Sequence, residues 1–266
     1  MKQLENNKIF YSATKKIDVS SSGFNTPILS HEWNETTQNG EITFEDSITS
    51  IEEGAFNGCE SLKNIVIPES VTSIEWSVFQ GCTSLGSVTI PESVTSIGSY
   101  AFYGCTSLES MVVPEGVASI GECAFSGCPA LKSISGKFAT EDNRALVVGE
   151  RLFAVAGSGL TEYAIPEGVK EIDSYVFKGC TSLDSVTIPD SVTSIESRVF
   201  AGCNNLKKFY GRFAADNGRC LIEDSEIIAY AAGSGTSYAI PDGVEKIIIG
   251  AFAVTLRLRV LLFQRV

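Results

Sequence analysis

The chain has 266 residues, a formal net charge of −12, one histidine and eight cysteines. Its 44% apolar and 20% charged residues are typical of a folded protein. The acidic balance argues against nucleic acids and anionic lipid surfaces as partners. With His31 as the single histidine, we expect neither a histidine-rich metal site nor most kinds of histidine-based catalysis.

Residues 1–41 do not follow the pattern that comes after them. They contain no apolar run as long as that of a signal peptide, and no segment of the chain approaches the roughly 18 apolar residues of a membrane span. No membrane span is therefore expected. Two interpretations stay open: a cytoplasmic protein, or one whose leader was removed or not included. Because a stack of repeats needs its first apolar layer covered, we expect 1–41 to form an N-terminal cap.

A 23-residue repeat occupies residues 42–252, and one copy is SLGSVTIPESVTSIGSYAFYGCT. Val88 and Ile90 alternate as in a half-buried strand. Pro91 ends this strand because proline has no amide proton to donate. The following SYAFYGC fits one or two helical turns closed by Gly104. One copy cannot bury a core, whereas stacked copies can, with neighbouring strands about 4.8 Å apart. The Leu, Val, Ile and Phe positions of stacked copies should then form continuous apolar columns. The sequence predicts a β-rich repeat solenoid with short helical turns.

Two copies of the repeat are longer, at 52 residues each. Residues 136–169 and 211–244 align without a gap, 75 residues apart. In each, two apolar runs flank a polar turn, which predicts a β-hairpin. We expect these hairpin insertions, at about 136–163 and 211–238, to stand out from one face of the solenoid. The apolar runs are Ala145–Val148 and Leu152–Ala156 in the first, and Cys220–Ile222 and Ile227–Ala231 in the second.

The string SVTIPESVTSIGSYAFYGCTSL at Ser87–Leu108 resembles the BspA-like, or treponemal-type, leucine-rich repeat. The resemblance covers roughly residues 6–252 and includes the opening NNKIFYSATKK and the YAIPDGV of the second long copy. It implies a right-handed leucine-rich-repeat solenoid, in a surface or secreted protein of a host-associated bacterium or of some protists. It also implies a protein partner, such as a host matrix protein or another bacterial surface protein. The family shares no catalytic residues, so the resemblance implies no active site.

Residues 253–266, AVTLRLRVLLFQRV, depart from the repeat. A one-base shift of codons for SVTIPES gives VLLFQRV, which makes a frameshifted repeat one hypothesis for this tail. An evolved C-terminal cap is the other. A frameshifted end would leave an uncovered apolar edge that favours self-association.

Two columns of side chains follow from the repeat. Six cysteines share one repeat position, so stacking predicts buried thiols acting as small hydrophobic groups rather than a disulfide framework or a zinc site. Six acidic residues follow the repeat proline and line one edge. They are either solvated turn residues or a site for divalent cations or a basic partner surface. The acids are Glu69, Glu92, Glu115, Glu167, Asp190 and Asp242, and the cysteines are Cys59, Cys82, Cys105, Cys128, Cys180 and Cys203.

The exposed face of the strands is the natural binding surface of a curved solenoid. We therefore predict a non-enzymatic protein-interaction or adhesion module without a cofactor. The alternative is a structural or self-associating repeat protein, which includes a truncated gene product. The candidate binding residues are Asn64, Ser87, Thr89, Ser110, Ser185, Thr187, Lys208 and Tyr210 on the strands, and Arg144, Arg151, Phe153, Arg212 and Arg219 in the insertions.

Overall fold

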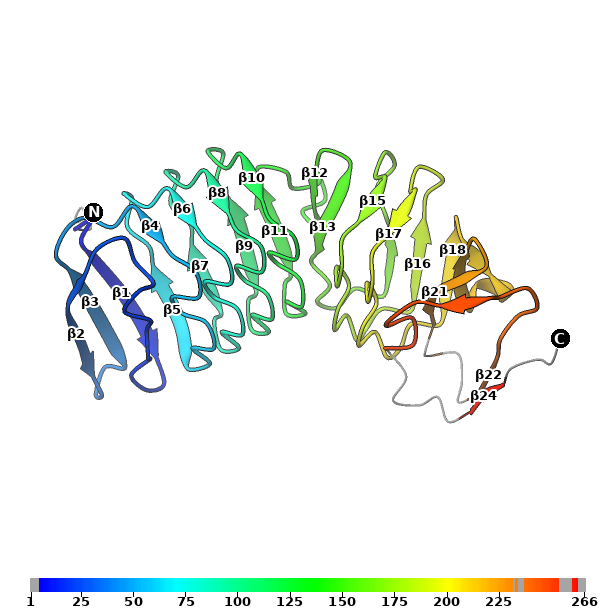
Figure 1. The fold of residues 1–266 in the computed structure, drawn as a ribbon, viewed down its shortest axis with the longest axis horizontal. Helices are drawn as coiled ribbons and strands as arrows, with labels where there is room; N and C mark the ends of the chain where they lie inside the picture. The colour runs from blue at the N-terminus through cyan, green and yellow to red at the C-terminus, as the bar shows by residue number, and fades with distance from the viewer. Residues whose placement is uncertain (1–4, 232, 234–236, 254–259, 263–266) are drawn as a thin grey trace. The chain divides into compact units, whose positions relative to one another are not determined.

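The computed structural model describes residues 5–231, 233, 237–253 and 260–262, the last three as backbone only. The chain divides into two compact units, Met1–Leu146 and Val147–Val266. Figure 1 shows that each is built from β-strands joined by turns, with a short 3-10 helix at Asp216–Gly218. The segment predicted as one solenoid, 42–252, thus contributes to both units.

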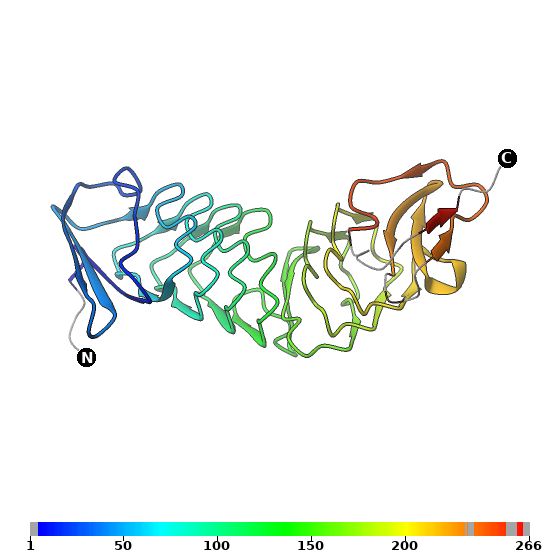
Figure 2. The same ribbon diagram turned by 90° about the horizontal axis from the view of Figure 1, so that it is seen from below.

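Unit 1 contains a stack of coils, each with two strands (Figure 2). The longer ones, here called front strands, lie one repeat apart and form two parallel pairs, with Asn64 opposite Ser87 in one and Ser110 opposite Ser133 in the other. The shorter ones, here called side strands, form a four-stranded parallel sheet. Front strands are β5 (Leu62–Val66), β7 (Ser87–Thr89), β9 (Ser110–Val113) and β11 (Ser133–Gly136). Side strands are β4 (Ser50–Ile51), β6 (Ser73–Ile74), β8 (Ser96–Ile97) and β10 (Ser119–Ile120).

The segment after each side strand is a series of turns, not the predicted helical turns. A helix would direct each amide to the carbonyl four residues earlier. Here the amide of Phe79 donates to the carbonyl of Ala101, and the amide of Phe102 to the carbonyl of Ala124, both at 2.7 Å. Tyr100 also has a φ of 59°, in the left-handed region, which interrupts a helix. Several hydrogen bonds of these turn segments therefore join one coil to the next, beside the bonds that close turns within a coil.

The core of unit 1 consists of columns of identical side chains. The rings of Phe56, Phe79, Phe102 and Phe125 stack at centroid distances of 5.1–5.3 Å. All four are fully or almost fully buried, and burying each stabilises the fold by about 2–3 kcal/mol. The 23-residue period places them in register, as the sequence predicted.

The N-terminal segment covers the first coil. Strand β1 (Lys8–Ala13) pairs antiparallel with both β3 (Asn39–Phe44) and the front strand β5, and β2 (Ile28–Asn34) adds to the far edge of β3. Phe24 packs against Phe44 and Phe56, at 4.7 and 5.7 Å between ring centroids. The first aromatic ring of the Phe column is therefore closed off by this segment.

Unit 2 repeats the coil design. Its front strands β14 (Glu162–Ala164), β16 (Ser185–Ile188) and β18 (Lys208–Gly211) form one parallel sheet. Its side strands include β15 (Glu171–Ile172), β17 (Ser194–Ile195) and β23 (Lys246–Ile247). Phe177 and Phe200 stack at 5.1 Å, as the phenylalanines of unit 1 do.

The two insertions contain the predicted strands, but these strands do not stand out from the coils. In the second, β20 (Cys220–Glu223) and β21 (Glu226–Tyr230) form an antiparallel hairpin, preceded by β19 (Ala214–Ala215). Strand β21 also pairs in parallel with the side strand β23. In the first insertion, β12 (Ala145–Val148) is followed by β13 (Arg151–Val155), which pairs in parallel with the side strand β15 in the same way. Four of the five residues in each of β13 and β21 are buried. A projecting hairpin would expose that apolar surface, so the expectation is wrong for these strands.

The tail lies mostly outside the described residues. Its described part, β24 (Val260–Leu262), pairs in parallel with β22 (Ser237–Ala239), with Ser237 opposite Val260. This is the 23-residue register of the other front strands. The choice between a frameshifted repeat and an evolved cap stays a prediction.

Candidate functional site

The outward side chains of the front strands in unit 1 form a polar row. Asn64, Ser87, Thr89 and Ser110 are exposed, and Val112 among them is 58% exposed. The Ser87 hydroxyl donates to Oδ1 of Asn64 at 2.6 Å, and Nδ2 of Asn64 donates to the Ser12 hydroxyl at 3.0 Å. These bonds align side chains from three strands without burying them.

A hollow interrupts this row where the N-terminal segment joins the first coil. It has a volume of about 340 Å³. Phe10 and Val66 supply apolar walls, and Ser12, Asn39 and Asn64 supply polar groups. Phe10 pairs across the strands with Val66, which places the two side chains on one face of the sheet. An apolar hollow edged by a few hydrogen-bonding groups is the usual form of a small binding site.

The front strands of unit 2 present a different chemistry. Thr187, Lys208 and Tyr210 are exposed and Ser185 is half-buried. The Lys208 ammonium lies 4.9 Å from the Tyr210 ring centroid, and Tyr210 is 45% exposed. An exposed tyrosine with a cation over its ring offers apolar area, a hydroxyl and a positive charge to a partner protein.

The insertion residues contribute less to a free surface than the sequence predicted. Phe153 is only 8% exposed, because β13 is built into the side-strand sheet and its ring packs inside, so its place on the binding surface is wrong. Arg144 donates to the carbonyl of Lys132 at 3.4 Å. Arg219 lies 5.0 Å from the Tyr238 ring and donates to the carbonyl of Ser237 at 3.3 Å. These arginines bind the insertions to neighbouring segments.

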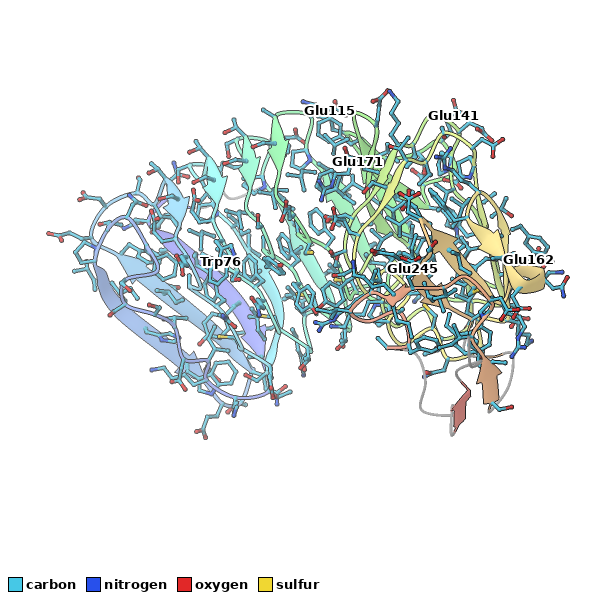
Figure 3. All side chains as sticks on the ribbon, turned by 45° about the vertical axis from the view of Figure 1, so that its right-hand side comes forward. Trp76, Glu115, Glu141, Glu162, Glu171 and Glu245 are labelled. Carbon is cyan, nitrogen blue, oxygen red and sulfur yellow. The ribbon has the colours of Figure 1, made fainter. Side chains whose placement is uncertain are left out.

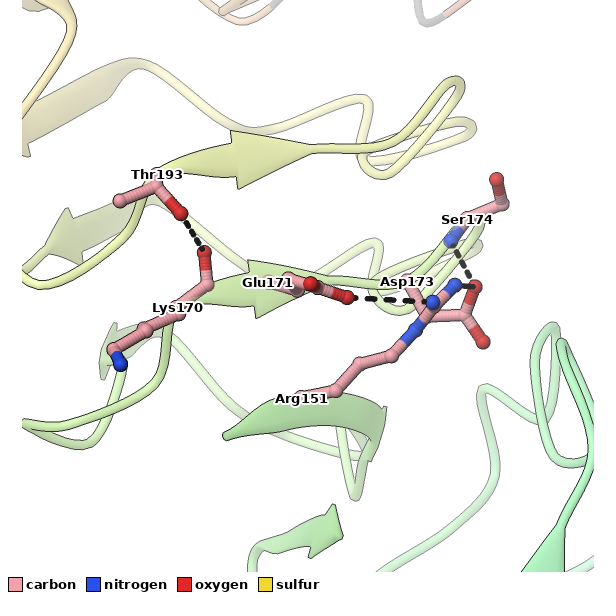
Figure 4. A network of polar contacts seen from close by, with 6 residues as sticks. All are labelled: Arg151, Lys170, Glu171, Asp173, Ser174 and Thr193. Atoms are coloured by element: carbon pink, nitrogen blue, oxygen red, sulfur yellow. Dashed lines mark hydrogen bonds and ion pairs between the residues drawn. The ribbon is translucent and has the colours of Figure 1, made fainter. Parts of the chain in front are cut away.

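Arg151 forms a polar network in unit 2 (Figure 4). Its guanidinium lies 2.9 Å from Asp173 and 3.4 Å from Glu171. The Asp173 side chain is 2% exposed and also accepts the amide of Ser174 at 2.8 Å. A buried carboxylate requires such a partner, so Arg151 acts in folding.

Two basic residues at the start of the insertions make contacts that the sequence did not predict. Lys137 donates to the carbonyl of Glu115 at 3.0 Å, and Arg212 donates to the carbonyl of Asp190 at 3.0 Å. Both acceptors are residues of the acidic column, and both donors follow a glycine, Gly136 or Gly211. The signal was present in the alignment of the insertions, where a basic residue and a phenylalanine follow each glycine. The sequence does not show which backbone carbonyl of the preceding coil lies within reach of this basic side chain.

The acidic column is solvated. All six of its carboxylates are exposed, including Glu115, which Figure 3 labels. Within the described part of the chain, no three His, Cys, Asp or Glu side chains gather closely enough to bind a metal ion.

The cysteine column is buried, as predicted, and all eight cysteines are free thiols. Four of them donate to the carbonyl of the phenylalanine one coil earlier, for example Cys82 to Phe56 at 3.1 Å and Cys203 to Phe177 at 3.0 Å. Burial raises the pKa of the Cys59 thiol to about 11 and that of Cys82 still further. Because a thiol with a raised pKa is seldom a thiolate at neutral pH, these groups are poor nucleophiles.

His31 is engaged within the N-terminal segment. Its Nε2 lies 2.7 Å from the Tyr11 hydroxyl, and burial together with the Lys16 charge lowers its pKa. Burial also raises the pKa of Tyr11 to about 12. The pair joins β1 to β2.

The BspA type leucine-rich repeat region model matches the chain in six copies, over residues 26–142 and 147–216. The chain belongs to this family. Most of its described coils, in both units, are thus BspA-type repeats. A comparison with curated proteins finds no match.

Two solved structures illustrate the relationship. A leucine-rich cell surface protein from Faecalibacterium prausnitzii A2-165 is 30% identical, with a TM-score of 0.64 over 83% of this chain and 65% of that one. The BspA-type chain thus spans about 65% of that protein's length. A leucine-rich repeat protein from Eubacterium ventriosum is 21% identical, with a TM-score of 0.53 over 82% of this chain and 71% of that one, and shows the same fold. Over the residues that the structure describes, no helix is both long and apolar enough to cross a membrane.

Proposed function

We propose that this BspA-type protein is a non-enzymatic interaction or adhesion module that binds a protein through the outward side chains of its front strands. The observation that carries the proposal is the contrast between the two sides of each strand. Inward residues stay apolar from coil to coil, whereas outward residues change from Glu162 to Ser185 to Lys208 at one position. Folding explains the constant side, and recognition gives a reason for the variable side.

The strand face of unit 2 is the stronger candidate contact. Lys208 and Tyr210 lie side by side and outward, and tyrosine is enriched among residues that dominate binding energy. Thr187 and Ser185 extend the same face by one coil. Arg212 follows directly along the chain, and its guanidinium donates to the carbonyl of Asp190 at the end of this face.

The partner class follows from the family resemblance and from the named relative. A host matrix protein or a surface protein of another bacterium fits a cell-surface module, and the Faecalibacterium relative is described as a cell surface protein. We therefore place the protein at the cell surface or outside the cell. Protease treatment of intact producing cells tests this placement: digestion of the protein supports it, and full protection contradicts it.

A variant whose outward residues on β18 match those of the neighbouring strand tests binding. The double variant Lys208→Ser with Tyr210→Thr gives β18 the outward residues of β16, Ser185 and Thr187. We expect the wild-type protein to bind immobilised matrix extract or bacterial cells, and the variant to lose most of this binding with an unchanged melting temperature. Leu29→Ser, an exposed apolar residue of β2, is the matched control. Equal binding by all three proteins would refute the proposal.

A structural, self-associating role is the second candidate. Strand β24 lies at the edge of the two-stranded sheet that it forms with β22, and edge strands pair readily with other chains. Light scattering after size exclusion would show mass rising with concentration, and a deletion of 253–266 would abolish the rise. A monomeric mass at all concentrations would exclude this role.

A further inference from the structure

An aromatic cluster lies on the turn segments of unit 1, away from the front strands. The Trp76 ring is 47% exposed, and Figure 3 labels it. Tyr100, from the next coil, meets it edge-on at 6.4 Å between centroids, and Tyr103 meets Tyr100 at 5.6 Å. We call these three residues the aromatic corner. An exposed tryptophan flanked by tyrosines is a surface feature rich in binding energy.

The charged residues of the coils that carry the aromatic corner are acidic. Residues 64–131 contain six glutamates and neither lysine nor arginine. Backbone hydrogen bonds place two acidic segments next to the corner: the amide of Tyr100 donates to the carbonyl of Glu122 at 2.9 Å, and Gly54, which follows Glu53, donates to the carbonyl of Trp76 at 3.0 Å. Glu53 and Glu122 are exposed. The charge complement of this region is a cation.

Unit 2 shows which cation suits this position of the coil. Tyr175 corresponds to Tyr100: each lies two residues before a stacked phenylalanine, with φ of 61° and 59°. The Arg198 guanidinium lies 5.9 Å from the Tyr175 ring centroid and donates to its hydroxyl at 2.7 Å. The Lys178 ammonium lies 5.2 Å from the same ring. At the coil positions of Lys178 and Arg198, unit 1 has Tyr103 and Cys123.

We propose that the aromatic corner of unit 1 binds an arginine or lysine side chain from a basic segment of a partner protein. The cation lies against the exposed Trp76 ring, as Arg198 and Lys178 lie against Tyr175, and the carboxylates of Glu53 and Glu122 complete its charge environment. Arginine is preferred, because its planar guanidinium stacks on an aromatic face while it donates to carboxylates. This surface is separate from the strand faces of the proposed function and does not depend on them.

The two tryptophans allow a direct test. In Trp33→Phe, which keeps an aromatic ring beside Tyr11, Trp76 is the single tryptophan. We expect its fluorescence to change saturably on titration with an octa-arginine peptide, more weakly with octa-lysine, and not at all with octa-glutamate. Unchanged fluorescence with octa-arginine would overturn the proposal.

Variants separate this site from general attraction to an acidic protein. Tyr100→Gly suits the left-handed backbone at this position and should weaken octa-arginine binding about tenfold, as should Trp76→Ala measured by calorimetry. Glu122→Gln should weaken it by a smaller factor. Glu92→Gln, an equal loss of charge at a proline turn, should leave affinity unchanged. If Glu92→Gln and Glu122→Gln weaken binding equally, or if Trp76→Ala has no effect, the attraction is nonspecific and the proposal is wrong.

Discussion

The two insertions, at about 136–163 and 211–238, are joined to the neighbouring coils in similar ways but by different side chains. Both begin with a left-handed glycine, at φ of 84° and 80°, followed by a cation that caps a carbonyl of the preceding coil. They differ where β13 and β21 meet the next side strand. There, Arg151 faces Glu171 in the first, and Glu226 faces Lys246 in the second, with the charges exchanged.

The difference shows what each position requires. The Glu226–Lys246 pair is partly exposed, with 2.7 Å between the charged groups, so only opposite charges are needed there. Arg151 also pairs with Asp173, whose carboxylate is buried beside it. The second insertion has Ile248 at the position of Asp173 and so has no such carboxylate there. The backbone geometry of the insertions is shared, and the buried charge is particular to the first.

Removal of Arg151 should destabilise the protein most. Arg151→Met leaves the Asp173 carboxylate buried without its cation and should lower the free energy of unfolding by about 3–5 kcal/mol. Lys246→Met, at the corresponding pair of the second insertion, should lower it by less than about 1 kcal/mol. Urea denaturation measures both.

A double variant checks the cause. Arg151→Met with Asp173→Ile copies the isoleucine of the second insertion and removes both charges together. It should recover most of the stability lost in Arg151→Met. If the double variant is as unstable as the single one, the buried carboxylate is not the reason for the loss.

The next largest loss of stability should come from substituting Gly211, the glycine at the start of the second insertion. A Cβ added at Gly211 would lie 2.0 Å from the carbonyl oxygen of Ile188, and one at Gly136 would lie 2.1 Å from that of Val113. Gly211→Ala should therefore cost about 2–4 kcal/mol from collision and backbone strain. Gly149, at φ of 61°, has no atom near its Cβ position, so Gly149→Ala isolates the strain at about 1 kcal/mol. Equal losses would mean that close approach is not what requires glycine there.

The second insertion has Cys220 where the first has Ala145. Replacing this cysteine by alanine should have a smaller effect on stability, and one that depends on pH. The Tyr238 hydroxyl donates to the Cys220 sulfur at 3.0 Å, so Cys220→Ala should cost about 1–2 kcal/mol at pH 7. Burial raises the pKa of Cys220 above its ordinary 9.0. A raised pKa gives stability that is complete below pH 9 and is lost as pH rises through the folded-state value. The gap between wild type and variant should therefore narrow above pH 9. A gap that stays constant in melts up to pH 10.5 would contradict this reasoning.

The smallest effect concerns the exchanged charges themselves. Lys246→Glu alone places two carboxylates together and should cost about 0.5–1 kcal/mol. Adding Glu226→Arg recreates the Arg–Glu order of the first insertion and should restore stability to within about 0.5 kcal/mol of wild type. A double-mutant cycle at low and high salt measures the coupling. Coupling that is absent at low salt would show that the pair contributes nothing.

Much of the fold could be predicted from the period of the sequence. The 23-residue register placed Phe56, Phe79 and Phe102 in one column and the buried thiols in another. The apolar runs of the insertions also gave the correct strands. The turn segments could not be predicted as turns, because SYAFYGC satisfies helical spacing, and only the neighbouring coil reveals where the amide of Phe102 bonds.

The site was predictable in outline and not in detail. Alternation placed Lys208 and Tyr210 outward, as observed. It failed for Phe153, because the sequence does not show that β13 joins the side-strand sheet. Nothing local to Asp173 marks it as buried, since its burial depends on Arg151 one coil away. Trp76 and Tyr100 lie 24 residues apart, one repeat plus one residue, so their contact could have been predicted from the repeat.

We expect the partner to bind the variable strand face of unit 2. Hydroxyl-radical footprinting of the protein, free and bound to the matrix or bacterial protein it captures, compares the oxidation rates of Tyr210 and Tyr175. We predict that binding protects Tyr210 several-fold and leaves Tyr175, on a turn segment of the same unit, unchanged. Oxidation of Tyr210 at the same rate in the free and the bound protein would contradict the account.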